Sequence, residues 1–167
     1  NPDLKWERKA TFNVGVEFTL FKNRLSGTVE YFRSVTDQLL GTIPLSGTTG
    51  FGGVTGNVGK LENKGFEAQI KTSIIRTRNF SWNVDGNFTL VRNKVLEYPN
   101  RTDFVGRALN TFFLVKYAGV DPANGDALYF DKTGKVVNTY NPDDRQFFGT
   151  GDAPHYGGIT NTFNYKG

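Results

Sequence analysis

Apolar and polar residues alternate without interruption from Ala10 to Leu20. A period of two places successive side chains on opposite faces of an extended chain, so this stretch predicts a β-strand with one apolar and one polar face. The apolar set is Ala10, Phe12, Val14, Val16, Phe18 and Leu20, and the polar set is Thr11, Asn13, Gly15, Glu17 and Thr19.

Four more segments repeat this alternation, at residues 25–34, 65–74, 80–90 and 156–166. One residue breaks the pattern, because Phe32 falls on the polar side of its strand. No segment has the 3.6-residue period that predicts a helix. The chain is therefore predicted to be all-β, with five main strands. Its polar faces carry the charged residues Glu17, Glu30, Glu67, Lys71 and Asp85.

The connections between the predicted strands alternate in length. Residues 22–24 and 76–79 are short turns, whereas the loops at about 36–57 and about 92–153 are long. In an antiparallel up-and-down meander, both short turns fall at one end of the sheet and both long loops at the other. Bacterial outer-membrane barrels have this asymmetry, with short periplasmic turns and longer extracellular loops. Strands of about 9–11 residues also suit a tilted crossing of a bilayer.

The second long loop contains hairpin signals of its own. Asn124-Gly125 and Lys132-Thr133-Gly134 are turn candidates, and short strands are expected at 117–120, 127–130 and 135–140. Asp121, Asn124 and Asp126 in this loop are spaced loosely like calcium ligands. A calcium loop needs a denser set of oxygen ligands, and turn chemistry explains these residues without a metal. They are weak calcium candidates only.

Composition excludes several classes of function. The chain of 167 residues has no cysteine, so it forms neither a disulfide nor a cysteine-ligated metal site. Its net charge of +4 is spread along the sequence, whereas nucleic-acid binding needs a concentrated basic face. The single histidine, His155, is accompanied by no Gly-x-Ser-x-Gly motif of a serine hydrolase. We expect no nucleic-acid partner, no cofactor and no enzymatic activity.

Alternation is also typical of a soluble antiparallel sheet with one wet face, so a soluble extracellular β-sandwich that binds carbohydrate is the alternative. Strand length, sorted loops and aromatic residues near strand ends favour the membrane barrel, because aromatic girdles mark its two interfaces. A glycosidase using Glu30 or Glu67 is a third hypothesis. The barrel predicts that the following side chains face outward and uncovered, whereas the sandwich buries them: Phe12, Val14, Val16, Ile70, Val84 and Phe88.

Several strings, in order along the chain, resemble the C-terminal barrel region of SusC/RagA-type TonB-dependent outer-membrane transporters. Each string alone is weak, but the ordered set is specific. The strings are Asn1-Pro2-Asp3-Leu4-Lys5-Trp6-Glu7, residues 20–27 with Tyr31-Phe32, Asn57-Val58-Gly59, Glu62-Asn63-Lys64-Gly65-Phe66-Glu67, Ala118-Gly119-Val120-Asp121-Pro122 with Asn124-Gly125-Asp126, residues 141–145 and residues 156–167.

This resemblance implies a 22-stranded transmembrane barrel in the outer membrane of a Gram-negative bacterium, closed by an N-terminal plug. It further implies energy supplied through TonB, a SusD-like surface lipoprotein as a lid, contact with outer-membrane lipid, and import of glycan oligomers or peptides. Residues 1–167 would form about five main strands of this barrel. Both ends look like cuts through a longer chain, with the plug and the remaining strands absent.

The resemblance also assigns tasks to particular residues. Glu17, Glu30, Glu67, Lys71 and Asp85 would face the water-filled or plug-contacting lumen. In the extracellular loops, aromatic side chains could stack on sugar rings, or they could pack the small hairpins of the loop itself. These candidates for substrate binding are Phe51, Tyr117, Tyr129 and Tyr140.

Overall fold

The computed structural model describes residues 2–99 and 101–166, so Asn1 and Gly167, which end two of the strings above, lie outside the described residues. The chain divides into two compact units. The sheet unit comprises the residues up to Leu109 and those from Ala153, and the loop unit is Asn110–Asp152. Within the described residues, no helix is long and apolar enough to cross a membrane.

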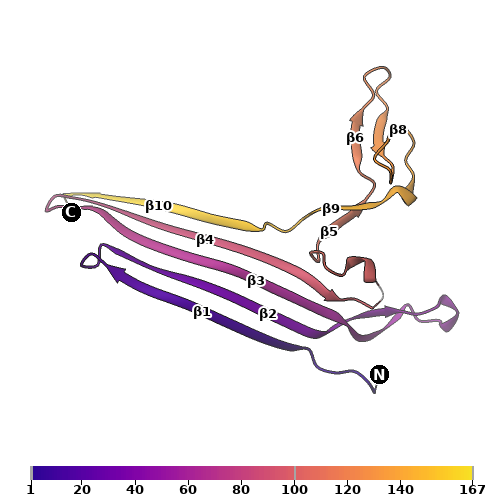
Figure 1. The fold of residues 1–167 in the computed structure, drawn as a ribbon, viewed down its shortest axis with the longest axis horizontal. Coiled ribbons are helices and arrows are strands. Elements are labelled where there is room, and N and C mark those ends of the chain that lie inside the picture. Colours follow the sequence, from indigo (N-terminus) through magenta and orange to yellow (C-terminus); the bar gives the residue numbers. More distant parts are fainter. Residues whose placement is uncertain (1, 100, 167) are drawn as a thin grey trace. The chain divides into compact units, whose positions relative to one another are not determined.

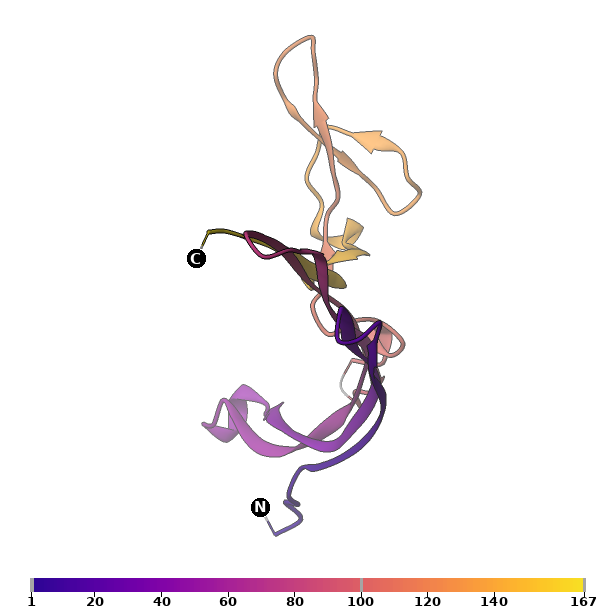
Figure 2. The same ribbon diagram turned by 90° about the vertical axis from the view of Figure 1, so that its left-hand side faces the viewer.

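The sheet unit is one antiparallel meander (Figure 1). Each strand pairs with the next in the order β1-β2-β3-β4-β10. Figure 2 views this sheet from one end, where it is a single curved layer of ribbon. The all-β meander predicted from the alternation is confirmed. The strands are β1 (Arg8–Leu20), β2 (Leu25–Pro44), β3 (Gly53–Arg76), β4 (Phe80–Glu97) and β10 (His155–Tyr165).

The register keeps the apolar residues of all strands on one face. Val16 pairs with Val29, Val29 with Ala68, and Ala68 with Phe88. A slip of one residue would turn a whole apolar set to the other face, so this alignment is strongly specified. We call the face with Val16 and Phe88 the apolar face and the opposite one the polar face.

The apolar face is uncovered. Val16 is 64% exposed and Phe88 is 43% exposed, and Phe12, Val14 and Ile70 are exposed as well, while Val84 is half-buried. Among the described residues, Val95 is the only buried hydrophobic side chain. Two packed sheets would bury these residues, so the β-sandwich alternative is wrong.

Phe32 interrupts the alternation because it covers a glycine on the polar face. Phe32 lies directly opposite Gly65 on β3, and a Cβ at Gly65 would collide with the Phe32 ring and with the backbone oxygen of Leu90. An aromatic ring across from a glycine fills the space that the missing side chain leaves and shields the backbone there. Phe18 and Gly27 form a similar pair on the apolar face.

Both short turns form where the sequence predicts them. In the first, Phe21, Lys22 and Asn23 have φ values of 55°, 56° and 64°, and the amide of Arg24 donates to the oxygen of Leu20 at 3.2 Å. In the second, the amide of Phe80 donates to the Thr77 hydroxyl at 3.1 Å. The turns are short enough to fix the register of the strands that they join.

The first long loop is shorter than the predicted 36–57. β2 continues to Pro44 and β3 begins at Gly53, so only residues 45–52 connect them, including the 3-10 helix η1 (Gly47–Thr49). The register shifts between Thr36 and Leu40, where Gln38 has a φ of 55°. This β-bulge changes the phase of the alternation, which hides the continuation of the strands. Similarly, β4 runs beyond residue 92 to Glu97.

The loop unit holds two small sheets. β6 (Tyr117–Val120) and β7 (Ala127–Phe130) form at the predicted positions, while β8 (Val136–Val137) is shorter than the predicted 135–140. A second pair, β5 (Thr111–Leu114) with β9 (Gln146–Thr150), was not predicted. It joins Phe113 to Phe147, whose ring centroids are 4.6 Å apart. Two more 3-10 helices, η2 (Thr102–Phe104) in the sheet unit and η3 (Pro142–Asp144) here, complete the described elements.

Adding a methyl group at Gly65 should destabilise the sheet. Gly65→Ala should cost about 1–3 kcal/mol because the methyl overpacks against Phe32 and the β4 backbone. Gly86→Ala is the matched control, since the nearest atom to its added Cβ would be 3.9 Å away. Urea unfolding of the complete barrel in detergent, followed by tryptophan fluorescence, would measure both. Equal stability of the two variants would contradict the role of the Phe32–Gly65 pair.

Candidate functional site: the polar face and the loop end of the sheet

The polar face brings the predicted charged residues onto one surface. Glu30 lies directly opposite Glu67, and Lys71 lies directly opposite Asp85. Glu17 stands beside them on β1, and a shallow hollow of about 150 Å³ is lined by residues that include Glu17 and Lys71. All five side chains are exposed or half-buried. The face is a wettable surface of mixed charge. It gives Glu30 or Glu67 no buried environment that would make it a general acid.

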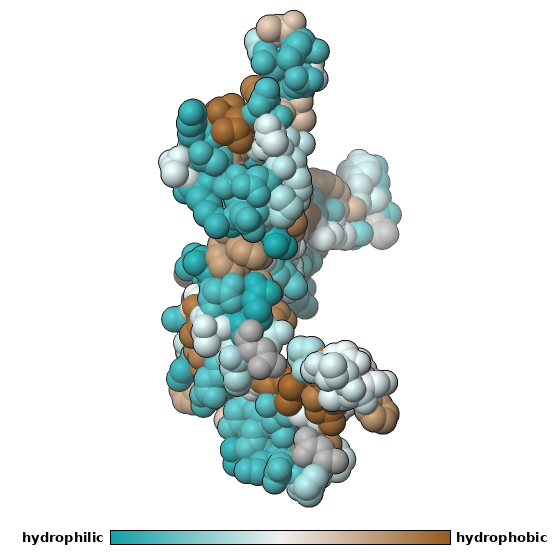
Figure 3. Space-filling model, turned by 90° about the vertical axis from the view of Figure 1, so that its right-hand side faces the viewer, coloured by the Kyte–Doolittle hydropathy of each residue, from teal (hydrophilic) through white to brown (hydrophobic). Residues whose placement is uncertain are grey.

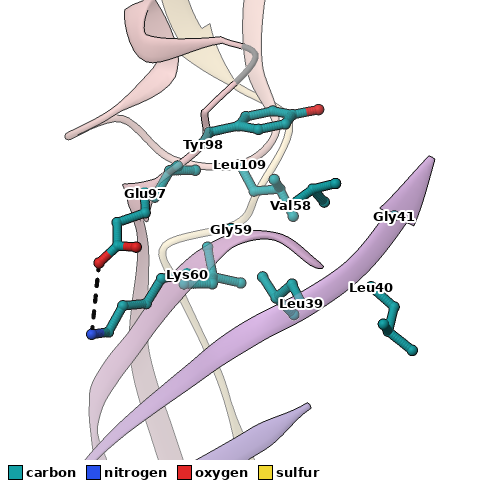
Figure 4. Close-up of a pocket in the computed structure, with 11 residues that line it drawn as sticks. Leu39, Leu40, Gly41, Val58, Gly59, Lys60, Glu97, Tyr98 and Leu109 are labelled. Carbon is teal, nitrogen blue, oxygen red and sulfur yellow. Dashed lines mark ion pairs between the residues drawn. The ribbon is translucent and has the colours of Figure 1, made fainter. Parts of the chain in front are cut away.

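The loop end of the sheet contains an apolar pocket that the alternation does not reveal (Figure 4). Its volume is about 330 Å³. An ion pair between Lys60 Nζ and Glu97 Oε1, at 3.8 Å, lies at its edge. The pocket was missed because its residues fall in or beside the predicted loops. The adjacent apolar residues Leu39-Leu40, which break the period of two, were the available signal. The apolar lining includes Leu39, Val58, Leu61, Val95, Tyr98 and Leu109.

Polar side chains attach the segment before β1 to the bulge. Asn57 donates to the carbonyl oxygens of Lys5 at 2.8 Å and Gln38 at 2.7 Å, and accepts from the Lys5 amide at 2.9 Å. Glu7 accepts from the Leu40 amide at 2.7 Å. A bulge leaves ladder groups without backbone partners, and these side chains take their place. Two of the strings that carry the family resemblance, around Glu7 and Asn57, therefore meet in space.

The three candidate tyrosines of the loop unit contact one another. Tyr129 lies between Tyr117 and Tyr140, with edge-to-face ring contacts at centroid distances of 6.3 Å and 5.5 Å. Tyr117 and Tyr140 nevertheless remain 56% exposed. Phe51 belongs to the sheet unit, in the connection between β2 and β3, and is 71% exposed. The tyrosines thus pack the hairpins, and ligand stacking by any of the four stays a prediction.

The weak calcium candidates are engaged in a turn. Asp121 accepts from the amide of Ala123 at 2.9 Å, and Asn124 accepts from the amide of Asp126 at 3.0 Å. The Asn124 amide group donates to the Asp126 carboxylate at 2.8 Å. In the described part of the chain, no group of three or more His, Cys, Asp or Glu side chains is placed to hold a metal ion. Turn chemistry accounts for these residues.

Figure 3 shows hydrophobic patches among mainly hydrophilic side chains on the surface of the chain. Residues 1–166 match the family model described as TonB dependent receptor-like, beta-barrel. The chain belongs to this family. Its place in a TonB-dependent receptor barrel explains the uncovered apolar face, because outer-membrane strands turn such a face to lipid.

Individual TonB-dependent receptors resemble the chain over most of its length. TonB-dependent receptor P39 of Formosa agariphila is 28% identical, covering 100% of the chain and 21% of that protein. TonB-dependent receptor SusC of Bacteroides thetaiotaomicron is 32% identical, covering 82% of the chain and 15% of SusC. The solved RagAB peptide transporter superposes with a TM-score of 0.85 at 27% identity, covering 100% of the chain and 20% of its own. The chain spans about a fifth or less of these relatives.

The family settles several expectations from the sequence. The SusC/RagA resemblance, the transmembrane barrel strands and the outer-membrane location in Gram-negative bacteria are confirmed. TonB-dependent receptors are transporters and not enzymes, which confirms the expectation that the chain is non-enzymatic.

Removing the Glu7 carboxylate should loosen the bulge locally. In Glu7→Ala the Leu40 amide loses its acceptor, and an exposed hydrogen bond of this kind contributes about 0.5–1.5 kcal/mol. Hydrogen exchange in the complete barrel should then be faster at Leu40 and unchanged in the β3–β4 ladder. Glu17→Ala removes a carboxylate from the polar face of β1 and should leave Leu40 exchange as it was. Unchanged exchange at Leu40 in the Glu7 variant would show that its contact contributes nothing.

The turn between β7 and β8 should loosen in acid. The Thr133 hydroxyl, at 2.7 Å, and the Lys135 amide, at 2.9 Å, hold the pKa of the Asp131 carboxyl below its ordinary value. A lowered pKa in the folded state stabilises the turn above the unfolded pKa, near 4, and this contribution is lost as pH falls through the folded value.

Amide exchange at Thr133 and Lys135, corrected for its intrinsic pH dependence, should therefore gain protection between the folded pKa and about pH 4 in the native protein. In Asp131→Asn this pH dependence should disappear. Asp143→Asn, which changes a carboxylate elsewhere in the loop unit, should retain it. A pH profile that is the same in native protein and Asp131→Asn would contradict the assignment.

Proposed function

We propose that the complete protein imports oligomeric nutrients, peptides or glycans, across the outer membrane in an energised cycle. In this proposal the chain contributes a stretch of barrel wall and extracellular loops. The observation that carries it is the two-faced sheet within the TonB-dependent receptor family, with an uncovered apolar face and a charged polar face. A barrel wall of this kind separates lipid from a hydrated passage.

Peptides are the first candidate cargo. The solved relatives with a TM-score of 0.85 are titled as the RagAB peptide transporter and peptide importer. Peptides carry charges of both signs at their termini and side chains. The polar face offers both signs too, with Lys71 opposite Asp85 and Glu30 opposite Glu67. Exposed pairs of this kind bind weakly, so they suit a surface that cargo must leave again.

Glycan oligomers are the second candidate, and one observation favours them. Tyr117 and Tyr140 are each 56% exposed although both contact Tyr129. An aromatic face of this kind can pack against the C–H face of a sugar ring, and Tyr adds a hydroxyl that donates hydrogen bonds.

We further infer two protein partners for the complete protein. TonB would supply energy, as the name of the family indicates. A SusD-like surface lipoprotein would cap the extracellular loops, as the SusC/RagA resemblance implies. Exposed apolar side chains in the loop unit support this partner, because a bound protein would cover them. Leu114 is 53% exposed and Val120 is 57% exposed.

Uptake assays would test the proposal. Cells carrying the complete transporter should accumulate a labelled peptide or glycan mixture, and loss of TonB should abolish this uptake. Uptake that persists without TonB would indicate a passive pore and would contradict the energised cycle. If neither class of oligomer is taken up in cells with an intact TonB system, the proposed cargo is wrong.

The double variant Tyr117→Ala, Tyr140→Ala separates the two cargoes. For a stacked glycan, removing two ring contacts should weaken uptake affinity about tenfold, at about 0.5–1.5 kcal/mol for each ring. Peptide uptake should change little. The control Tyr117→Phe, Tyr140→Phe keeps the rings and should retain glycan affinity. A glycan affinity that survives the alanine variants would show that these tyrosines only pack the hairpins.

A further inference from the structure

The apolar face becomes positively charged towards the loop end of the sheet. Its four cross-strand rows between Leu20 and Val14 carry no charged residue on β1 to β4 or β10. The next row, which begins at Phe12, continues with three cations. Arg33 pairs with Phe12, Lys64 with Arg33, and Arg92 with Lys64.

A fourth cation lies in the next row on the same face. Lys94 follows Arg92 by two residues, so it lies on the same face, and its partner across the ladder is Glu62. Because neighbouring strands are about 4.8 Å apart, Arg33, Lys64 and Arg92 lie within about 10 Å along the row. We call Arg33, Lys64, Arg92 and Lys94 the basic patch.

The carboxylate of Glu62, which lies beside the basic patch, is already paired with Arg33. Arg33 Nε donates to Glu62 Oε2 at 2.6 Å, and Glu62 is buried at 7% exposure. Lys64, Arg92 and Lys94 are exposed, and none of them forms an ion pair within residues 2–99 and 101–166. Like charges directly opposite one another destabilise a sheet. The patch therefore keeps a surplus of positive charge that an external anion would relieve.

The height of the patch indicates which anion meets it. The rows just below it carry the exposed apolar side chains Tyr31, Phe66 and Phe88, which face hydrocarbon in a membrane barrel. The patch lies on the side of the long connections, which is the extracellular side. Headgroups border the hydrocarbon at this height. A lipid there would place acyl chains on the apolar rows and its phosphate on the patch, whereas free phosphate would use only the patch.

We propose that the basic patch binds the phosphate groups of lipid headgroups in the extracellular leaflet. Arg92 suits this task because a guanidinium donates two parallel hydrogen bonds to phosphate oxygens, and Lys64 and Lys94 add positive charge beside it. The cargo does not compete for this site, since the patch is on the face opposite Glu30, Glu67 and Lys71. The inference rests on the barrel orientation and is independent of the cargo proposed above.

Native mass spectrometry of the complete transporter in detergent would test the site. The probe is lipid A with two phosphates, compared with the same lipid after removal of both phosphates. The variant Lys64→Gln, Arg92→Gln, Lys94→Gln should bind the bisphosphorylated lipid about a hundredfold more weakly, at about 1 kcal/mol for each charge near the headgroups. The phosphate-free lipid should bind weakly to both proteins.

A matched control removes three cations elsewhere: Lys9→Gln and Lys71→Gln on the polar face, with Lys132→Gln in the loop unit. This control should bind lipid A as the native protein does, and Lys64→Arg, Lys94→Arg should retain binding. Circular dichroism of each variant reports whether the barrel is folded. If the glutamine variant does not fold, the native protein's preference for phosphorylated over phosphate-free lipid decides alone.

Three outcomes would overturn the proposal. These are equal binding of the two lipids by the native protein, equal loss in the patch variant and the control, and displacement of the lipid by millimolar inorganic phosphate alone. Equal binding of the two lipids would mean that only apolar contact holds the lipid. Equal loss in the variant and the control would indicate a general effect of charge, and displacement by phosphate would indicate a site for free phosphate.

Discussion

Every backbone amide and carbonyl that enters hydrocarbon must find a partner within the protein, because no water is available there. This requirement governs the sheet more than packing does. Strands β2, β3 and β4 are paired along both edges, and the described residues contain a single buried hydrophobic side chain, Val95. A soluble domain of this size would rest on a hydrophobic core. Here the backbone ladder provides the framework, and the lipid takes the place of a core.

The same requirement explains which side chains lie at the irregular points of the ladder. Where Gln38 introduces a bulge, the side chains of Asn57 and Glu7 supply the missing partners of the backbone. Where Gly65 leaves the backbone bare, the Phe32 ring covers it. At both points, side chains from neighbouring segments therefore protect the main chain of the ladder. The outer edges of β1 and β10 have no partner strand in the described residues, and neighbouring strands of a closed barrel would pair with them.

Much of the sheet followed from the alternation because a period of two has direct consequences. It placed Val16 and Phe88 on one face and Glu17 and Asp85 on the other, and it located both short turns. It failed beyond Gln38, since a bulge shifts the phase without changing the composition. The pairing of Phe113 with Phe147 was also hidden, because strands far apart in sequence leave no local signal. The basic patch was missed because Arg33, Lys64 and Arg92 become neighbours only when the register is known.

The connection from β4 to β10 carries the entire loop unit, yet β10 pairs with β4 over its whole length, from His155 to Tyr165. The entropy of closing a flexible connection rises only with the logarithm of its length, by about 0.6 kcal/mol for each doubling. Insertions or exchanges within the loop unit, Asn110–Asp152, would therefore cost the wall little stability, whereas a one-residue slip of β10 against β4 would reverse every row of that pair. The barrel can thus acquire new surface recognition through this connection while its wall stays the same.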